Sequence, residues 1–248
     1  MLAGLRTARG VMRSLGIYYG RHQRGRAEAM DRLHGHFINR GDLAFDVGAH
    51  VGDRVASFRR LGARVVALEP QPALGFTLNM LYGRDRAVVV ERMAVGRAAG
   101  AIELMLNTAN PTVSTASGAF VDAARNADGW REQHWDRSIR VPVTTLDALI
   151  AKHGKPAFIK IDVEGFEEEA LAGLSQPIKA LSFEFTTIQR EMARACIERC
   201  VSLGLSSFNA ALGESQELGS WRSASELARW LDGLPHSANS GDIYARLP

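Results

Sequence analysis

The feature that most constrains the fold is a short apolar strand that runs into a helix through a glycine-containing loop. Leu43 to Val47 form the apolar segment, Gly48 and Gly52 follow it, and Gly52 to Leu61 has the pattern of a helix. Glycine at such a turn lets the backbone approach a ligand without a Cβ in the way. A strand, a glycine loop and a helix in this order predict an α/β domain with a nucleotide-like ligand at the loop.

Short apolar segments alternate with amphipathic ones along most of the 248 residues. This alternation predicts a Rossmann-like, doubly wound α/β sheet with helices on both faces. We expect further strands at residues 64–68, 88–94, 158–161, 180–185, 205–210 and 242–247. We expect five further helices. One spans residues 72–81, two begin at residues 145 and 166, a long one ends at residue 203, and one ends near residue 231 after a capping box at Ser223 and Glu226.

We divide the chain into a basic helical appendage, residues 1–40, and one large domain, residues 41–248. The alternation lapses inside this domain, where residues 101–106 and 139–143 have the pattern of a pair of strands. The polar segment between them, about residues 107–138, is too long for a simple connection. We interpret it as a lid over the site, with a decorative insertion as the alternative.

The spacing and charge of the glycine loop indicate the kind of ligand. Gly48 and Gly52 form G-x-x-x-G with His50 between them, whereas a dinucleotide fingerprint reads G-x-G-x-x-G. Asp46 and Asp53 flank the loop, and their carboxylates would repel a pyrophosphate. A cationic adenosine ligand such as S-adenosylmethionine suits these charges better than NAD.

Glu69 supports an adenosine ligand because it ends the second expected strand. An acid at this distance from the first loop accepts both ribose hydroxyls of an adenosine ligand. Two hydroxyl donors and two carboxylate oxygens form a geometrically specific pair.

Several segments in the same order make the chain similar to class I methyltransferases, and to the FkbM family in particular. The segments are Phe45–Asp53, Leu68-Glu69-Pro70, Thr145-Leu146-Asp147, Phe158–Gly165 and Gly241–Tyr244. The most specific of them is the K-I-D-V-E-G block within Phe158–Gly165, and the resemblance covers roughly Gly41 to the C-terminus.

The resemblance implies a mainly parallel seven-stranded sheet with an antiparallel last strand, and S-adenosylmethionine as the methyl donor. It also implies which residues bind this donor. Asp46, Gly48, Ala49, His50 and Gly52 are expected near its methionine end, Glu69 near the ribose, Met93 and Ala94 near the adenine, and Asp162 beside it. The sequence has no acid at the adenine position, so we expect backbone groups and apolar contacts there.

Three acids are candidates for catalysis, because a hydroxyl acceptor needs a group that takes its proton. Asp162 and Glu164 follow the fourth expected strand and lie two residues apart, so an extended chain would place them on one side. Glu184 ends the next strand. Asp162 could instead cap the following helix or orient the donor, and Glu164 could form a salt bridge to Lys160 or to an arginine of the appendage.

Three carboxylates at one sheet edge could also hold a divalent cation, but our prediction is a site without a metal. His34 and His36 have no third ligand in view, so we expect them at the surface.

Cysteine usage and apolar runs indicate a cytoplasmic, soluble protein. Cys196 and Cys200 would share one face of a helix as buried thiols, which suits a reducing compartment. No apolar run approaches the roughly 20 residues of a spanning helix.

The net charge of +3 derives from arginines that precede the first acid, Glu28. These are Arg6, Arg9, Arg13, Arg21, Arg24 and Arg26. A basic leader of this kind could contact phosphate or an anionic lipid surface. The alternative is a leader helix that is simply packed or solvated.

We predict an S-adenosylmethionine-dependent O-methyltransferase that acts on a hydroxyl of a small molecule or glycan. Acceptor choice is expected to reside in residues 107–137 and 212–240, which both follow strands. A nucleic-acid methyltransferase is less favoured, since residues 162–165 read D-V-E-G rather than [D/N]-P-P-[Y/F] and an acidic mouth repels polynucleotide. A non-catalytic donor-binding or interaction module is the second alternative.

Overall fold

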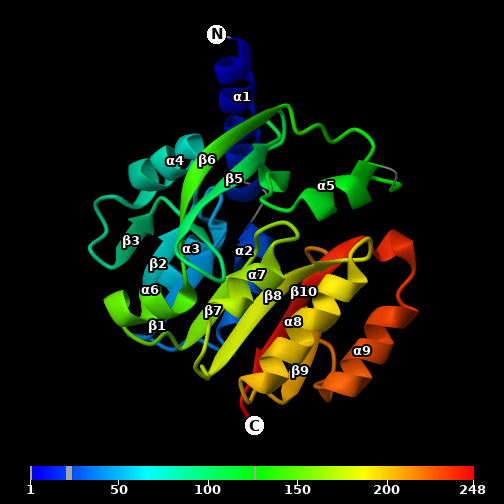
Figure 1. The fold of residues 1–248 in the computed structure, drawn as a ribbon. Coiled ribbons are helices and arrows are strands. Elements are labelled where there is room, and N and C mark those ends of the chain that lie inside the picture. The colour runs from blue at the N-terminus through cyan, green and yellow to red at the C-terminus, as the bar shows by residue number, and fades with distance from the viewer. Residues whose placement is uncertain (1, 21–23, 126) are drawn as a thin grey trace.

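The computed structural model describes residues 2–20, 24–125 and 127–248, and its centre is a seven-stranded sheet (Figure 1). The strands are β1 (Leu43–Val47), β2 (Arg64–Leu68), β3 (Val88–Glu91), β7 (Phe158–Ile161), β8 (Ala180–Thr186), β9 (Ser207–Leu212) and β10 (Ser240–Arg246). Their order is β3-β2-β1-β7-β8-β10-β9. Only β10 runs antiparallel to its neighbours β8 and β9, which confirms the predicted fold class.

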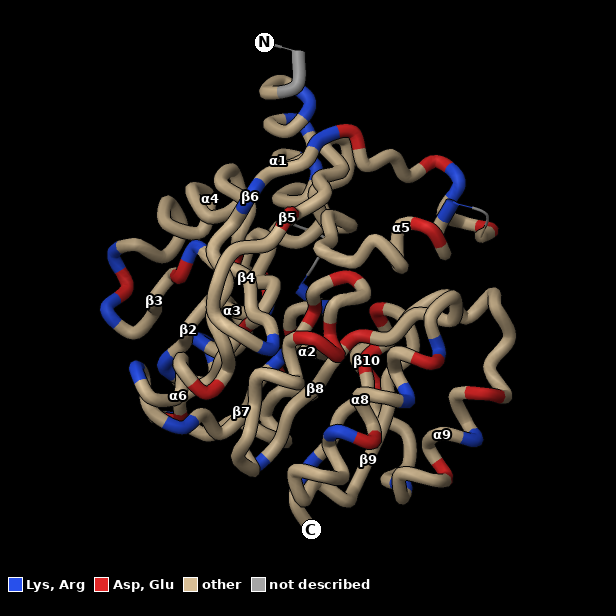
Figure 2. Tube along the Cα trace, viewed as in Figure 1, with Lys and Arg blue, Asp and Glu red and all other residues tan. Residues whose placement is uncertain are grey.

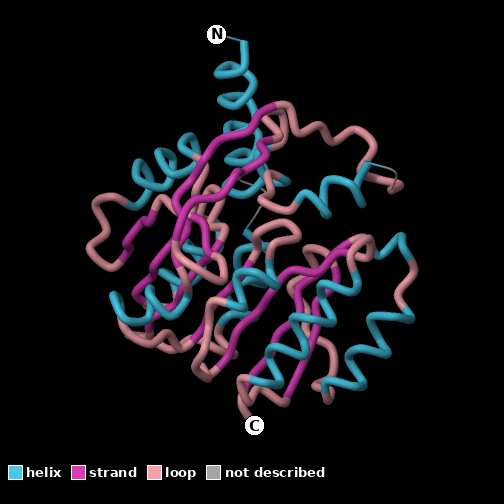
Figure 3. Tube along the Cα trace, viewed as in Figure 1, coloured by secondary structure: helices cyan, strands magenta, loops and turns pink. Residues whose placement is uncertain are grey.

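Helices cover both faces of this sheet, as a doubly wound fold requires (Figure 3). One face packs against α6 (Leu146–His153), α7 (Glu167–Ala172), α8 (Arg190–Ser202) and α9 (Ala224–Gly233). The other face packs against α2 (Arg24–His34), α3 (Asp53–Arg60) and α4 (Pro72–Tyr82). Cys196 and Cys200 lie on the buried face of α8, and both are free thiols, as predicted.

A second sheet, of order β4-β6-β5, stands beside the first. Its strands are β4 (Ala94–Val95), β5 (Gly100–Leu106) and β6 (Arg137–Thr144). The predicted pairing of β5 with β6 is confirmed, and it is antiparallel. The expected single strand at 88–94 is wrong. β3 is an edge strand that ends at Glu91, and Ala94 then pairs with Val143 of β6, which buries Val95.

The segment between β5 and β6 contains the 3-10 helix η2 (Pro111–Val113) and α5 (Gly118–Arg125). It has a small core of its own, in which Phe120 packs edge-on against Trp130 and Trp135. Whether this segment opens as a lid stays a prediction. A last 3-10 helix, η3 (His236–Ala238), precedes β10.

The appendage forms α1 (Leu2–Tyr19) and α2. Val11 of α1 packs on Val51 and Leu74, whereas Leu33 of α2 joins the main core. Arg21 lies outside the described residues. The division of the chain at residue 40 stays a prediction.

The expectation of a surface His34 is wrong, because His34 is buried and its Nδ1 lies 2.8 Å from the Ser57 hydroxyl. Its ring also packs edge-on against Phe58. Burial lowers the pKa of His34 to about 3, so the ring is neutral. The exposed His36 agrees with the prediction.

No helix among the described residues has both the length and the apolar character needed to cross a membrane.

Candidate active site

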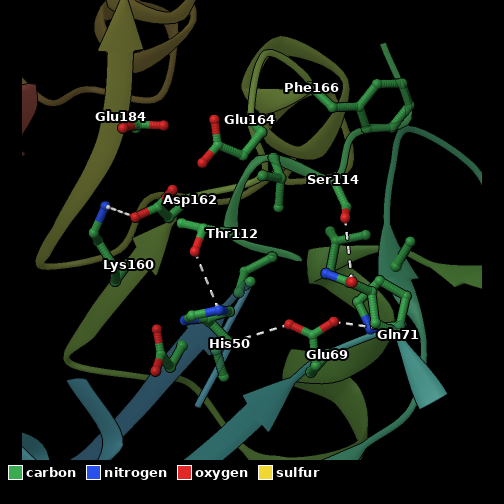
Figure 4. Close-up of a pocket in the computed structure, with 18 of the residues that line it drawn as sticks. His50, Glu69, Gln71, Thr112, Ser114, Lys160, Asp162, Glu164, Phe166 and Glu184 are labelled. Carbon is green, nitrogen blue, oxygen red and sulfur yellow. Dashed lines mark hydrogen bonds and ion pairs between the residues drawn. The ribbon is translucent and has the colours of Figure 1, made fainter. Parts of the chain in front are cut away.

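The candidate site is a cavity of about 1000 Å³, open mouth included, at the carboxyl ends of β1, β2, β7 and β8 (Figure 4). Parallel strands that end together at one sheet edge form the usual ligand crevice of such folds. Ten predicted site residues line it: Asp46, Gly48, Ala49, His50, Glu69, Met93, Ala94, Asp162, Glu164 and Glu184. The chain thus brings together acids that are far apart in the sequence.

Gly48 fixes how closely the first loop packs on the end of β7. Its φ is +86°, and a Cβ at this position would lie 1.7 Å from the carbonyl oxygen of Asp162. The amides of Gly48 and Ala49 both donate to the carbonyl of Leu68 at the end of β2. The loop therefore joins three strand ends and needs glycine for steric reasons.

Gly52 is not among the lining residues of the cavity. Its φ is +84°, and an added Cβ would lie 2.7 Å from the side chains of Leu78 and Tyr82 on α4. The hydroxyl of Tyr82 also donates to the Gly52 carbonyl at 2.8 Å. The structure explains this glycine by helix packing, and a direct role in ligand binding stays a prediction.

Glu69 is buried at the end of β2, with both carboxylate oxygens held by the backbone. The amide of His50 donates to Oε2 at 3.0 Å, and the amide of Gln71 donates to Oε1 at 2.8 Å. Burial raises the pKa of Glu69 to about 8. Each oxygen keeps a further lone pair, and Glu69 lines the cavity.

Asp46 is buried at the end of β1, and its Oδ2 has no hydrogen-bond partner among the described residues. Burial, with the nearby Asp53 carboxylate, raises the pKa of Asp46 to about 7. A buried oxygen without a hydrogen-bond partner is costly, so this environment favours a ligand that brings a hydrogen-bond donor or a cation to Asp46.

Asp53 behaves differently from the free flanking acid that we expected. Arg54 lies 2.6 Å and Arg26 3.1 Å from its Oδ2. Burial alone would raise the pKa of Asp53, but the two guanidinium groups outweigh it and lower the pKa to about 2. Its charge is therefore already compensated.

Asp162, Glu164 and Glu184 converge on the other side of the cavity, with one carboxylate oxygen of each within 4.8 Å of the others (Figure 4). The reason that we gave for this proximity is wrong. β7 ends at Ile161, and Glu164 has a φ of +56°, so a turn rather than an extended chain brings the two acids together.

Lys160 compensates one charge of this cluster. Its Nζ lies 3.1 Å from Asp162 Oδ2 and 2.6 Å from Asp242 Oδ1. The salt bridge that we considered for Glu164 does not occur among the described residues. Nor does Asp162 cap a helix, since Phe166 occupies the N-cap position of α7.

Because Lys160 lies beside Asp162, the pKa values of the three acids shift in different directions. Burial would raise the pKa of Asp162, but Lys160 and Arg54 outweigh it and lower the pKa. Burial and the neighbouring Asp162 carboxylate raise the pKa of both Glu164 and Glu184 well above the ordinary value. The cluster thus combines one carboxyl group whose pKa is lowered with two whose pKa values are raised, and the same oxygens could accept a divalent cation.

Met93 and Ala94 line the cavity because β3 ends early. The chain leaves the main sheet after Glu91 and crosses toward the second sheet, which brings these two residues to the cavity wall. They present an apolar surface, in line with the expected contacts to adenine.

The 107–138 segment reaches the cavity through Thr112 and Ser114. Thr112 Oγ1 lies 3.3 Å from His50 Nε2, and Ser114 Oγ donates to Gln71 Oε1 at 3.2 Å. Gln71 Nε2 in turn donates to the carbonyl of Pro111 at 3.0 Å. The segment is thus tethered directly to the loops that follow β1 and β2.

Sequence reasoning did not name as site residues several that line the cavity: Tyr18, Arg54, Gln71, Thr112, Ser114, Lys160 and Glu214. Thr112, Ser114 and Glu214 nevertheless lie in the two segments expected to select the acceptor. Lys160 and Gln71 were within reach, since they adjoin the motifs of Asp162 and Glu69. Tyr18 and Glu214 carry no local signal, because α1 and the segment after β9 meet the cavity only through tertiary packing.

Comparison with known proteins adds a family and a relative. Residues 46–223 match the family model described as methyltransferase FkbM domain. The 31-O-demethyl-FK506 methyltransferase FkbM of Streptomyces tacrolimicus is 31% identical over 165 residues, which is 57% of this chain and 62% of that protein. The chain therefore matches less than two thirds of the length of this relative.

Solved structures with a similar chain course include methyltransferases of low sequence identity. An O-methyltransferase from Bacillus cereus, solved in complex with SAH, is 13% identical with a TM-score of 0.48 over 96% of this chain and 90% of that chain. A TehB-like SAM-dependent methyltransferase from Corynebacterium glutamicum is 13% identical with a TM-score of 0.45 over 89% of this chain and 88% of that chain.

Proposed function

Because the chain belongs to the FkbM family of S-adenosylmethionine-dependent methyltransferases, we propose that it methylates a hydroxyl group of a small molecule or glycan. The observation that carries this proposal is the division of one cavity into two sides. Asp46 and Glu69 line one side, and the Asp162, Glu164 and Glu184 cluster lines the other. The name of the Streptomyces relative, a methyltransferase for 31-O-demethyl-FK506, supports a small-molecule acceptor.

The residues of the first side fit the donor. The free lone pairs of the Glu69 carboxylate suit two ribose hydroxyls, since backbone amides already fix the orientation of the group. The unpartnered Asp46 oxygen suits the positively charged methionine end. Ala94 and Met93 supply apolar surface for the adenine.

The second side suits a hydroxyl acceptor. The bound donor supplies a methyl carbon that its sulfonium already activates, so the protein must align the acceptor oxygen and remove its proton. The lowered pKa of Asp162 favours its ionised form, which takes this proton as the oxygen–carbon bond forms and the bond from the methyl carbon to sulfur breaks. The raised pKa values of Glu164 and Glu184 favour their protonated forms, which can donate hydrogen bonds to oxygens of the acceptor.

The charges of the cavity support a neutral or cationic acceptor. Two cationic side chains line it, Lys160 and Arg54, and both are held in ion pairs with acids. A phosphate or a polynucleotide would meet carboxylates instead, which disfavours a nucleic-acid methyltransferase. The segments expected to select the acceptor both contribute to the lining, through Thr112 and Glu214.

The proposed compartment is the cytoplasm, and the support for it is the pair of free, buried thiols Cys196 and Cys200.

Donor binding is tested by calorimetry with S-adenosylmethionine and, in parallel, with NAD. We expect binding of S-adenosylmethionine alone, and Glu69→Ala should weaken it about 100-fold, since hydrogen bonds to a charged group are worth roughly 1.5–3 kcal/mol each. Binding of NAD without S-adenosylmethionine would refute the proposal. Donor binding without transfer to any hydroxyl acceptor in a labelled-donor screen would favour a binding module.

The role of Asp162 is tested against Glu184 as a matched control. Asp162→Asn should lower kcat by about 10²–10⁴ while donor affinity changes less than about fivefold, because a positioned base contributes that much. Glu184→Gln imitates the protonated carboxyl, so kcat at pH 7 should stay within about fivefold of the parent. Full turnover by Asp162→Asn at every pH would exclude it as the base.

A further inference from the structure

Most exposed large apolar side chains of the described residues lie on two neighbouring helices, α1 and α4. Met80 is 72% exposed, Met12 67% and Phe76 61%. We name this set the α1–α4 surface: Leu5, Met12, Ile17, Phe76, Met80 and Leu81. A monomeric protein rarely gathers such side chains without a partner.

The two helices pack against each other, so their exposed apolar residues belong to neighbouring elements. Val11 and Leu15 of α1 pack with Ala73 and Leu74 of α4. The hydroxyls of Tyr19 and Tyr82 lie 2.8 Å apart. The first turns of α1 extend beyond the rest of the fold, which leaves them accessible to a large partner (Figure 1).

The charged side chains that the two helices themselves carry are all basic. Arg6, Arg9 and Arg13 are exposed on α1, which contains no acid, and α4 contains no charged residue (Figure 2). Arg6 lies 3.8 Å from Asp136, and no ion pair of Arg9 or Arg13 occurs within the described part of the chain. The arginines are therefore available to an anionic partner.

This pattern argues against a second copy of the chain as the occupant. A two-fold interface places the same surface on both subunits, so the arginines of both copies of α1 would enter one interface to which α1 and α4 contribute no acid. Nucleic acid would use the arginines but leave Phe76, Met12 and Met80 in water. An anionic lipid surface uses both, because basic groups contact headgroups and apolar side chains enter the acyl boundary.

We infer that the α1–α4 surface docks the protein onto an anionic lipid bilayer. The opposite face of α1 contributes Tyr18 to the wall of the candidate site. Since a helix is about 10 Å across, docking holds that wall close to the headgroups, where an acceptor at the membrane surface can reach it. The inference does not rest on donor binding, so membrane docking can fail while the proposed function holds.

Flotation of the full chain with vesicles tests the inference. We expect binding to phosphatidylcholine vesicles that contain about one third phosphatidylglycerol, weak binding to pure phosphatidylcholine, and release at high salt. Arg9→Gln with Arg13→Gln should weaken partitioning about 30-fold, at roughly fivefold for each basic residue. Phe76→Ser with Met80→Ser should weaken it at least tenfold.

Matched controls separate this surface from general effects of charge and polarity. Arg64→Gln with Arg229→Gln removes two exposed arginines elsewhere, and Val201→Ser removes an exposed apolar side chain on α8. Each control should bind vesicles as the parent does. Thermal melts verify folding, and calorimetry with S-adenosylmethionine should give the parent value for every variant.

Three results would overturn the inference. The first is failure of the parent chain to bind phosphatidylglycerol vesicles at low salt. The second is equal binding by the α1 and α4 variants. The third is a dimer in sedimentation that Phe76→Ser with Met80→Ser dissociates, which would assign the surface to a second copy.

Discussion

The two sides of the cavity hold their acids in different ways. On the donor side, Glu69 is fixed by two backbone amides that lie within two and nineteen residues of it. On the acceptor side, Asp162, Glu164 and Glu184 come from the ends of two strands and a turn, and their carboxyl groups approach one another. The first arrangement is built by local chain geometry, and the second by tertiary packing.

The electrostatic consequence also differs between the sides. The donor side carries acids whose pKa burial raises to about 7 for Asp46 and to about 8 for Glu69, so both change charge near neutral pH. On the acceptor side Lys160 lowers the pKa of Asp162, while burial and the neighbouring carboxylate raise the pKa values of Glu164 and Glu184. The charge of the donor side therefore changes with pH near neutrality. On the acceptor side, Lys160 separates the pKa of Asp162 from those of Glu164 and Glu184.

The largest effect is expected from Gly48→Ala, because Gly48 lies where the loop after β1 contacts the end of β7. The new Cβ would lie 1.7 Å from the Asp162 carbonyl oxygen, so the loop and the end of β7 must separate. We expect a loss of more than about 3 kcal/mol in the free energy of unfolding, of which the positive φ accounts for roughly 1–2 kcal/mol. Donor affinity should fall more than 100-fold.

Gly41→Ala is the matched control, since Gly41 has a φ of +89° but nothing within 4 Å of an added Cβ. It should cost only the conformational penalty, roughly 1–2 kcal/mol, in urea denaturation. If the two variants unfold at the same urea concentration and bind donor equally, the steric account of the loop is wrong.

A smaller effect is expected from pH on donor binding. Asp46 and Glu69 attract the cationic donor only when ionised, so donor affinity should rise at least about tenfold from pH 6 to pH 8. Calorimetry across this range measures the change and the protons released. Asp46→Asn should remove the part of the rise near pH 7, and a flat profile in the parent would contradict the assignment.

Stability without donor should change in the opposite sense. Both carboxyls have raised pKa values, so the folded chain holds protons that the unfolded chain has released. Their stabilising contribution is present at pH 4 and is lost as the pH rises through about 7 to 8.

The same contrast explains how much the sequence could predict. β1, β2 and β7 begin and end where expected, because their apolar runs are bounded by glycine, proline or acids. The donor loop follows from these boundaries and from residues adjacent in the chain. Because residues close together in the sequence determine the geometry of this loop, the sequence alone was enough to predict it.

Elements defined by tertiary partners were harder to predict. The strand at 88–94 divides between two sheets because β6 offers a partner to Ala94 and Val95. His34 is buried because α2 turns that face toward α3, where the Ser57 hydroxyl accepts or donates a hydrogen bond. Tyr18 reaches the cavity from α1 for a similar reason, which no local motif announces.

The smallest expected effect concerns Gln71, where the donor side holds the 107–138 segment. Gln71→Leu removes the bonds to Pro111 and Ser114 but leaves the backbone amide that fixes Glu69. Two hydrogen bonds at about 1 kcal/mol each predict roughly 10–30-fold faster amide exchange in residues 107–117, while donor affinity changes less than about threefold.

Ser138→Ala is the control for this last variant, because Ser138 bonds Glu103 at an exposed position of the same β5–β6 pair. It should leave exchange in residues 107–117 unchanged. Faster exchange in Gln71→Leu alone would mean that the donor loop governs opening of the segment, as a lid requires. Unchanged exchange would mean that the core of Phe120, Trp130 and Trp135 holds the segment as a fixed wall, and the lid interpretation would then be wrong.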